Sequence, residues 1–346
     1  MNLQSLRLGV SAVLGLALGI AGLLNTPHVE AADPVFNWVK ATDAAPWQPR
    51  DSSGEVVLHD AMWLMGGWFD SYKAYPRDVW RSSDGRDWTR VFDQAPWTSA
   101  DLPMTVAFQD RMWFMGGWYN GRLPGAKATN EIWASRDGAA WDRIETTNCW
   151  SPRFAAGTAV FKDRMWVLGG LIENFNSTEA DRRNDVWSSS DGRTWTRELE
   201  HAPWSPRAYH GVLAFDNKLW VLGGGNYLPE YQAASDVWCS EDGRSWTNVT
   251  EAAPWHPRIW FSSVVYRDHL WILGGWSKTP ERNWGDVWYS RDGRDWKELK
   301  SDVVWKARHE HSTYVHRDRI WVVGGHAKPL SNEVWSLELP ADWNGQ

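Results

Sequence analysis

The sequence has little of what defines several common classes of protein. Its 346 residues include only two cysteines, Cys149 and Cys239, which are too few for a disulfide scaffold. Only 23% of the residues are charged, the net charge is -7, and no run of Lys or Arg occurs. A nucleic-acid partner needs a basic surface, so this balance argues against one. After the N-terminal region, no apolar stretch is long enough to span a bilayer, which argues against an integral membrane segment once that region is removed.

The first 31 residues have a character of their own. Arg7 precedes an apolar stretch over residues 8–24, and polar residues then lead to a Val-Glu-Ala triplet that ends at Ala31. This order is typical of an export signal peptide with a cut after Ala31. An uncleaved anchor helix is the alternative, although 17 residues are short for a membrane span. We therefore expect a secreted or periplasmic protein.

Tryptophan and glycine are abundant, with 30 and 29 residues, and both follow one repeat. A Gly-Gly pair recurs every 50 to 54 residues in six copies, which is the mark of a repeat architecture. The pairs begin at Gly66, Gly116, Gly169, Gly223, Gly274 and Gly324. Each pair follows a Trp by three residues, a second Trp comes later, and a Ser-x-Asp-Gly turn follows it in five copies. Cys149 and Cys239 fall at different repeat positions, so we expect no bond between them.

A third and a fourth Trp, nine residues apart, close each unit except the last. Trp38 and Trp47 have this same spacing at the other end of the sequence. We therefore expect the N-terminal strand to complete the last unit. Each unit predicts four short strands, which in the fourth copy cover residues 208–215, 219–222, 236–240 and 245–249, with a hairpin at Asp242-Gly243. Six such units predict an all-β fold, a six-bladed β-propeller.

The repeat resembles the kelch repeat in Pro206-Arg207, His210, the strand into Gly223-Gly224, Asp236-Val237-Trp238 and Trp246. The resemblance covers residues 35–339, so we place the propeller at 35–340 and a tail at 341–346. Two enzyme families with kelch-like propellers suggest possible activities for this sequence. Galactose-oxidase-like copper chemistry is not expected, because neither cysteine has a suitable tyrosine context. The periplasmic sialic-acid mutarotases keep an enzymatic alternative open.

Antiparallel strand order, with strands a to d in each blade, brings the d–a and b–c loops to one face. The b–c loops vary in length and are rich in aromatic residues, and variable loops on a rigid scaffold are where binding residues concentrate. The d–a loops deliver an arginine in every copy but the second, which has Ala100. The predicted ligand-binding residues on this face are Arg50, Arg153, Arg207, Arg258, Arg308, His210, His311, Trp68, Trp118, Trp260, Trp276 and Trp284. For each arginine a structural role, stacked on a repeat Trp, is the alternative.

Possible chemistry on this face concentrates near Arg308. His309 and His311 alternate to one side of a predicted strand, with Glu310 on the other side, and His326 opens on the same face. Converging histidines hold metals in some proteins, but no ligand motif of diagnostic spacing occurs, so we predict no metal and no cofactor. Asp51, Asp101 and Glu310 are among the acid–base candidates, outside any known motif.

These observations predict a ligand-binding propeller rather than an enzyme. The expected ligand is a carbohydrate or a protein or peptide, bound on the face of the b–c and d–a loops. The first alternative is a sugar mutarotase or epimerase acting on an acidic sugar, because arginine binds carboxylates with two hydrogen bonds. The second alternative is a structural or assembly protein.

Overall fold

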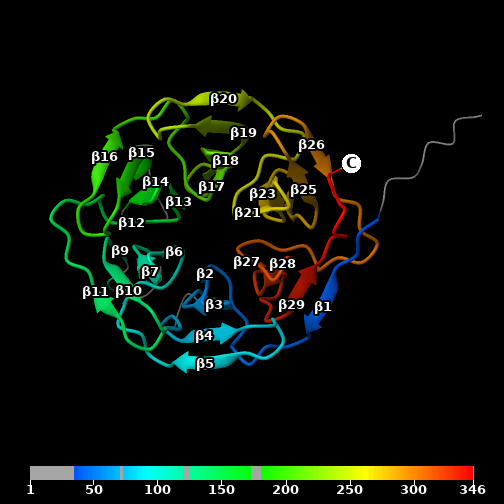
Figure 1. The fold of residues 1–346 in the computed structure, drawn as a ribbon, viewed down its shortest axis with the longest axis horizontal. Coiled ribbons are helices and arrows are strands. Elements are labelled where there is room, and N and C mark those ends of the chain that lie inside the picture. The colour runs from blue at the N-terminus through cyan, green and yellow to red at the C-terminus, as the bar shows by residue number, and fades with distance from the viewer. Residues whose placement is uncertain (1–34, 71–72, 120–124, 126, 173–180, 346) are drawn as a thin grey trace, which may run out of the picture. The chain divides into compact units, whose positions relative to one another are not determined.

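The chain folds into six four-stranded antiparallel sheets arranged in a ring (Figure 1). The computed structural model describes residues 35–345 except 71–72, 120–124, 126 and 173–180. The predicted export signal, residues 1–31, lies outside the described residues and stays a prediction. Among the described residues there is no helix long and apolar enough to cross a membrane. Both cysteine thiols are unpaired.

Each blade runs from an inner strand a to an outer strand d. Blade 1 has β2 (Gly54–Leu58), β3 (Ala61–Met65), β4 (Val79–Ser82) and β5 (Thr89–Phe92). Blade 2 has β6 (Met104–Phe108), β7 (Arg111–Met115), β10 (Ile132–Ser135) and β11 (Asp142–Arg143). Blade 3 has β13 (Gly157–Phe161), β14 (Arg164–Ile172), β15 (Arg182–Ser189) and β16 (Thr196–Leu199), and β12 (Arg153–Phe154) also pairs with β14.

The other three blades follow the same plan. Blade 4 has β17 (Gly211–Phe215), β18 (Lys218–Asn226), β19 (Gln232–Ser240) and β20 (Thr247–Thr250). Blade 5 has β21 (Ser262–Tyr266), β22 (His269–Leu273), β25 (Val287–Ser290) and β26 (Trp296–Glu298). Blade 6 has β27 (Ser312–His316), β28 (Arg319–Val323), β29 (Val334–Leu337) and β1 (Val39–Thr42). Two b–c loops form small hairpins, β8 (Trp118–Tyr119) with β9 (Lys127–Ala128) and β23 (Trp276–Lys278) with β24 (Glu281–Asn283).

The prediction that the N-terminal strand closes the last blade is confirmed. β1 pairs antiparallel with β29, and Lys40 lies opposite Trp335. Trp38 packs edge-on against Trp305, with ring centroids 5.9 Å apart, and Trp47 packs against Trp88 at 4.5 Å. The closure therefore joins the two ends of the ring through buried tryptophans as well as through backbone hydrogen bonds.

The Ser-x-Asp-Gly turn joins neighbouring blades as well as strands c and d. In blade 3, Asp191 Oδ1 accepts hydrogen bonds from the backbone N–H groups of Arg193 at 2.8 Å and Thr194 at 2.9 Å. Gly192 has a φ of 72°, and a Cβ there would lie 2.1 Å from the ring of Trp113 in β7 of blade 2. Glycine is therefore required by the backbone and by the close approach of the neighbouring blade.

Candidate functional site

The five predicted arginines lie at the start of the innermost strands, but their guanidinium groups are buried inside the blades. Their exposed fractions are only 0 to 3%. In blade 3, Arg153 donates to both carboxylate oxygens of Asp185 at 2.7 and 2.9 Å and to the carbonyl of Gly169 at 2.8 Å. The same pattern joins Arg50 to Asp78, Arg207 to Asp236 and Arg258 to Asp286, whereas Arg308 donates to one carboxylate oxygen of Glu333, Oε2.

These ion pairs join the segment before strand a to strand c in five blades, and blade 2, which has Ala100 at this position, lacks the pair. Burial alone would raise the pKa of Asp185, but the hydrogen bonds and charge of Arg153 outweigh it and lower that pKa. Because each guanidinium forms its hydrogen bonds within its own blade, the geometry favours a structural role for all five arginines. Ligand contact by these arginines stays a prediction without geometric support.

A cavity of about 350 Å³ opens at the centre of the ring. Two rings of side chains from the six blades line it. We term the first ring the rim ring. Each blade contributes the residue two positions after the repeat arginine, or after Ala100 in blade 2, and these residues are Ser52, Leu102, Ala155, Tyr209, Trp260 and Glu310. The second ring stands three residues further on and consists of Glu55, Thr105, Thr158, Val212, Ser263 and Thr313.

The backbone of the rim ring is left-handed in every blade. The φ angles lie between 50° and 59°, although none of the six residues is glycine. Five backbone hydrogen bonds run from one ring residue to the next, for example from Leu102 N–H to Ser52 O at 3.1 Å and from Glu310 N–H to Trp260 O at 2.9 Å. A left-handed residue other than glycine costs about 1–2 kcal/mol, and such strain gathers at functional sites. The strained ring therefore holds six unlike side chains at one level of the cavity.

One side of the rim is acidic. Glu310 lines the cavity, Asp51 and Asp101 are buried beside it, and we term these three residues the acidic cluster. Burial raises the pKa of Glu310 well above its usual value, and the charges of Asp51 and Asp101 raise it further. Burial and the charge of Asp51 likewise raise the pKa of Asp101. Ser52 donates its hydroxyl to Asp51 Oδ1 at 3.2 Å.

The other side of the rim is aromatic. Tyr209 packs edge-on against Trp260 with ring centroids 5.3 Å apart, and Trp260 packs against Tyr227 at 4.7 Å and Trp276 at 5.5 Å. We term these four residues the aromatic wall, of which Tyr209 and Trp260 line the cavity while Tyr227 and Trp276 pack behind Trp260. The hydroxyl of Tyr209 and the indole N–H of Trp260 are buried without a hydrogen-bond partner in the described part of the protein. Buried Tyr O–H and Trp N–H groups usually have a hydrogen-bond acceptor, so a ligand or a water molecule that reached these two groups would supply the acceptor they lack.

Three of the twelve predicted residues, Trp260, His210 and His311, line the cavity. Burial, aided by the charge of Arg207, lowers the pKa of His210 to about 3. Burial and the charge of Arg308 do the same for His311. Both imidazoles are therefore neutral at physiological pH.

The remaining predicted tryptophans lie away from the cavity surface. Trp118 is 2% exposed and packs on Phe154 with ring centroids 5.0 Å apart. Trp68 is half-buried and stacks on His326 at 6.5 Å, while Trp276 belongs to the aromatic wall. Trp284 stacks on His256 at 4.8 Å in a b–c loop. The structure therefore brings only part of the predicted set together.

Ser52, Tyr209 and Glu55 are among the cavity residues that sequence reasoning missed. Ser52 and Tyr209 could have been found, because they occupy the repeat position whose residue type varies most from copy to copy in an otherwise regular segment. Glu55 follows the regular strand pattern and gives no such signal. Burial raises the pKa of Glu55 to about 7, although hydrogen bonds with Ser312 and Thr313 oppose the shift.

The chain is a six-bladed β-propeller of the kelch type. No family model matches the sequence. Kelch domain-containing protein 2 of Mus musculus is 29% identical over 145 residues, which are 41% of this chain and 32% of that protein. The dynein alpha chain of the flagellar outer arm of Chlamydomonas reinhardtii is 30% identical over 177 residues, or 45% of this chain and 4% of that protein.

A xyloglucanase of Paenibacillus sp is also similar, at 26% identity over 144 residues, or 36% of this chain and 14% of the enzyme. The chain thus spans about a third or less of the length of these curated relatives. Among solved structures, YjhT superimposes with a TM-score of 0.68 over 87% of this chain and 98% of that one, at 13% sequence identity. At this identity the likeness shows the fold alone.

Proposed function

We propose that the central cavity binds a carbohydrate, with a neutral or amino sugar favoured over an acidic one. The observation that carries this proposal is that Glu310 of the acidic cluster and Tyr209 and Trp260 of the aromatic wall line one cavity. Carboxyl groups form hydrogen bonds with sugar hydroxyls in either protonation state, because the ionised form accepts them and the protonated form also donates one. Aromatic rings offer a flat apolar surface for the face of a sugar ring. The cavity volume of about 350 Å³ lies within the range of about 300–1,000 Å³ that is usual for small-molecule sites.

The charge of the cavity supports a ligand without a carboxylate. Among the described residues that line it there are no lysines or arginines, and two, Glu55 and Glu310, are acidic. The arginines that were expected to bind an acidic sugar are instead paired with Asp78, Asp185, Asp236, Asp286 and Glu333. An anionic ligand would therefore meet carboxyl groups without a compensating cation. The peptide ligand, the assembly role and the export of the chain stay predictions.

A second candidate is a proton-transfer enzyme, such as a mutarotase or epimerase, acting on the same class of sugar. It is favoured by one observation, since Glu310 and Tyr209 both line the cavity. Groups placed on two sides of a bound ring suit acid–base catalysis. Anomer exchange followed by NMR, with and without protein, separates the two candidates. Faster exchange identifies an enzyme, whereas an unchanged rate leaves a binding protein.

The binding proposal is tested with a panel of neutral, amino and acidic monosaccharides and disaccharides in saturation-transfer NMR, followed by calorimetry on those that bind. We expect Trp260→Ala to weaken binding at least tenfold, because Trp260 lines the cavity. Trp284→Ala is the matched control, since this loop tryptophan does not line the cavity, and it should bind as the wild type does. Binding of acidic sugars alone, or equal losses in both variants, would overturn the proposal.

A further inference from the structure

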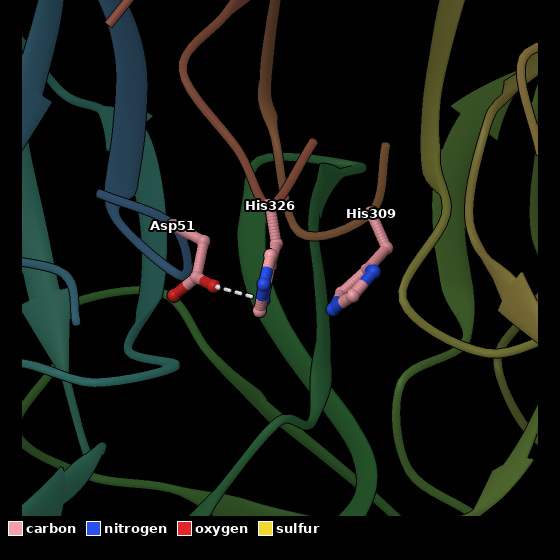
Figure 2. Close-up of side chains that lie close together, drawn as sticks. All are labelled: Asp51, His309 and His326. Carbon is pink, nitrogen blue, oxygen red and sulfur yellow. Dashed lines mark ion pairs between the residues drawn. The ribbon is translucent and has the colours of Figure 1, made fainter. Parts of the chain in front are cut away.

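Two histidines and an aspartate meet beside the cavity, between blades 6 and 1. Figure 2 shows Asp51, from the segment before β2, reaching toward His326, from the segment after β28, with His309 on the other side of His326. One ligand atom from each of the three residues lies within 4.8 Å of the other two. Asp51 Oδ2 is 3.5 Å from His326 Nδ1. We propose that Asp51, His309 and His326 bind one divalent transition-metal ion, and that Zn²⁺ is the ion that this donor set fits.

The expected histidine cluster is corrected by this geometry. Strand alternation predicted that His309, His311 and His326 converge, and no metal was expected there. Glu310, however, has a φ of 51°, so the backbone is not extended there and the alternation does not hold. His311 packs on Trp305 with ring centroids 5.3 Å apart and is not one of the three. Asp51 takes its place, and the carboxylate adds the negative charge that three neutral histidines lack.

The separation of Asp51 and His326 suits two ligands of a tetrahedral ion. Zinc bonds of about 2.0–2.1 Å to nitrogen and oxygen place two ligand atoms about 3.3 Å apart across a tetrahedron. The Asp51–His326 separation of 3.5 Å is close to this value. His309 and His326 are also held as a cross-strand pair, because the N–H of His326 donates to the carbonyl of His309 at 2.8 Å and the reverse bond is 3.4 Å. Directly opposed residues of this kind place their side chains on the same face.

A neighbouring amide fixes the tautomer of His309. Asn283 donates its side-chain N–H₂ group to the carbonyls of Ala307 at 3.3 Å and His326 at 2.7 Å, so its oxygen must face the other way. That oxygen lies 2.8 Å from His309 Nδ1, which therefore carries the proton. The lone pair of His309 is then on Nε2. Histidine ligands of metals commonly donate their other N–H to such a partner.

Aromatic stacking holds both imidazole rings in place. Trp260 stacks on His309 with ring centroids 5.1 Å apart and an interplanar angle of 20°. Trp68 stacks on His326 at 6.5 Å and 25°. Two histidines and one carboxylate would leave a fourth position of the ion free, as in open zinc sites. The site is adjacent to the cavity, because Ser52 and Glu310, the next residues after Asp51 and His309, line it. It does not depend on the identity of the sugar.

The test uses the full chain without a histidine tag, freed of metal by dialysis against a chelator. Co²⁺ is added first, because four-coordinate Co²⁺ shows intense visible absorption, and Zn²⁺ is then added to displace it. We expect one equivalent of Co²⁺ at micromolar concentration, its displacement by Zn²⁺, and a higher thermal midpoint with Zn²⁺ bound. His326→Ala should weaken binding at least a hundredfold, and Asn283→Leu by about 10–100-fold, since Asn283 only orients a ligand.

The matched control is His59→Ala. His59 and Asp110 form an exposed histidine–aspartate pair, with side chains 45% and 58% exposed and outside the three-residue group. This variant should bind as tightly as the wild type. His326 is 31% exposed, so its replacement should leave the fold intact, and the metal-free thermal midpoint checks this. Absence of stoichiometric Co²⁺ or Zn²⁺ uptake by the wild type, or equal affinity in His326→Ala and His59→Ala, would overturn the proposal.

Discussion

Replacing Arg153 by Met tests the structural role that the fold gives to the repeat arginines. Arg153 is 1% exposed and donates to two oxygens of Asp185, to the carbonyls of Gly169 and Ser151, and to the hydroxyl of Ser151. Met fills a similar volume but restores none of these bonds. Asp185, whose side chain is 10% exposed, would be left charged inside the blade without its arginine partner and would keep the hydrogen bond from the indole N–H of Trp187.

The expected loss is large because the pair is buried. Removal of one partner of a buried ion pair costs about 3–5 kcal/mol, whereas replacement of both partners by apolar residues is often neutral. We therefore expect Arg153→Met to lower the free energy of unfolding by about 3–5 kcal/mol. The double variant Arg153→Met/Asp185→Leu should recover most of the loss.

The loss should also depend on pH. Arg153 lowers the pKa of Asp185, so the pair stabilises the wild type above the ordinary carboxyl pKa of 3.8, and this contribution disappears as the pH falls through the lowered value. In Arg153→Met the same carboxyl is buried without a cation, and protonation relieves it. The difference between wild type and variant should therefore shrink as the pH falls below about 4.

Denaturant unfolding, followed by both tryptophan fluorescence and circular dichroism, measures these differences, since agreement of the two probes checks for cooperative unfolding. Sugar binding, measured by calorimetry on the folded variant, should be unchanged because Arg153 does not face the cavity. A loss below about 1 kcal/mol, or a double variant less stable than the single one, would refute the buried-pair reasoning. Loss of sugar binding in a stably folded variant would instead restore the ligand role of the arginine.

Three further predictions concern Glu55 in the second ring of cavity residues, the Ser-x-Asp-Gly turn and the closure of the ring. Burial raises the pKa of Glu55 from 4.5 to about 7, so the wild type should lose up to about 3 kcal/mol of stability as the pH rises from 4.5 to 7. Glu55→Gln should remove this dependence of stability on pH, as measured by denaturant midpoints across that range. Asp191→Ala removes the acceptor of two backbone N–H groups and should cost about 1–2 kcal/mol in the same assay, whereas Ser190→Ala, at the exposed position before it, should cost little. Trp38→Ala should cost about 3–5 kcal/mol and speed hydrogen exchange in β29 more than in β18, because Trp38 packs against Trp305 where β1 closes the ring; uniform exchange throughout the propeller would contradict a local role.

The regular part of the fold was predictable because each repeated residue has a local physical role. Gly192 marks a turn that needs a positive φ, and Trp113 marks the buried strand that this glycine touches. The spacing of Trp38 and Trp47 was enough to predict the closure by β1. The turn repeats in five copies and the buried strand in six, so one sequence carries several independent signals of the same structure.

The candidate site was predicted only in part, because its geometry breaks the local rules. Trp260 and Leu102 have left-handed backbones that no propensity for turns would assign to them. The same conformation at Glu310 separates His309 from His311. The arginines were correctly placed in the d–a loops, four residues before the innermost strands. Their partners are 25 to 32 residues away in sequence and become visible only when strand c returns beside strand a.

The most direct test of the central claim is a crystal structure of the protein with a sugar that saturates it in solution. The account predicts density for the sugar inside the central cavity, with one face of its ring on Trp260 or Tyr209 and a hydroxyl within hydrogen-bond distance of Glu310. A sugar bound at the loop that carries Trp284, or on the outer strands of the blades, with the cavity containing only water, would contradict it.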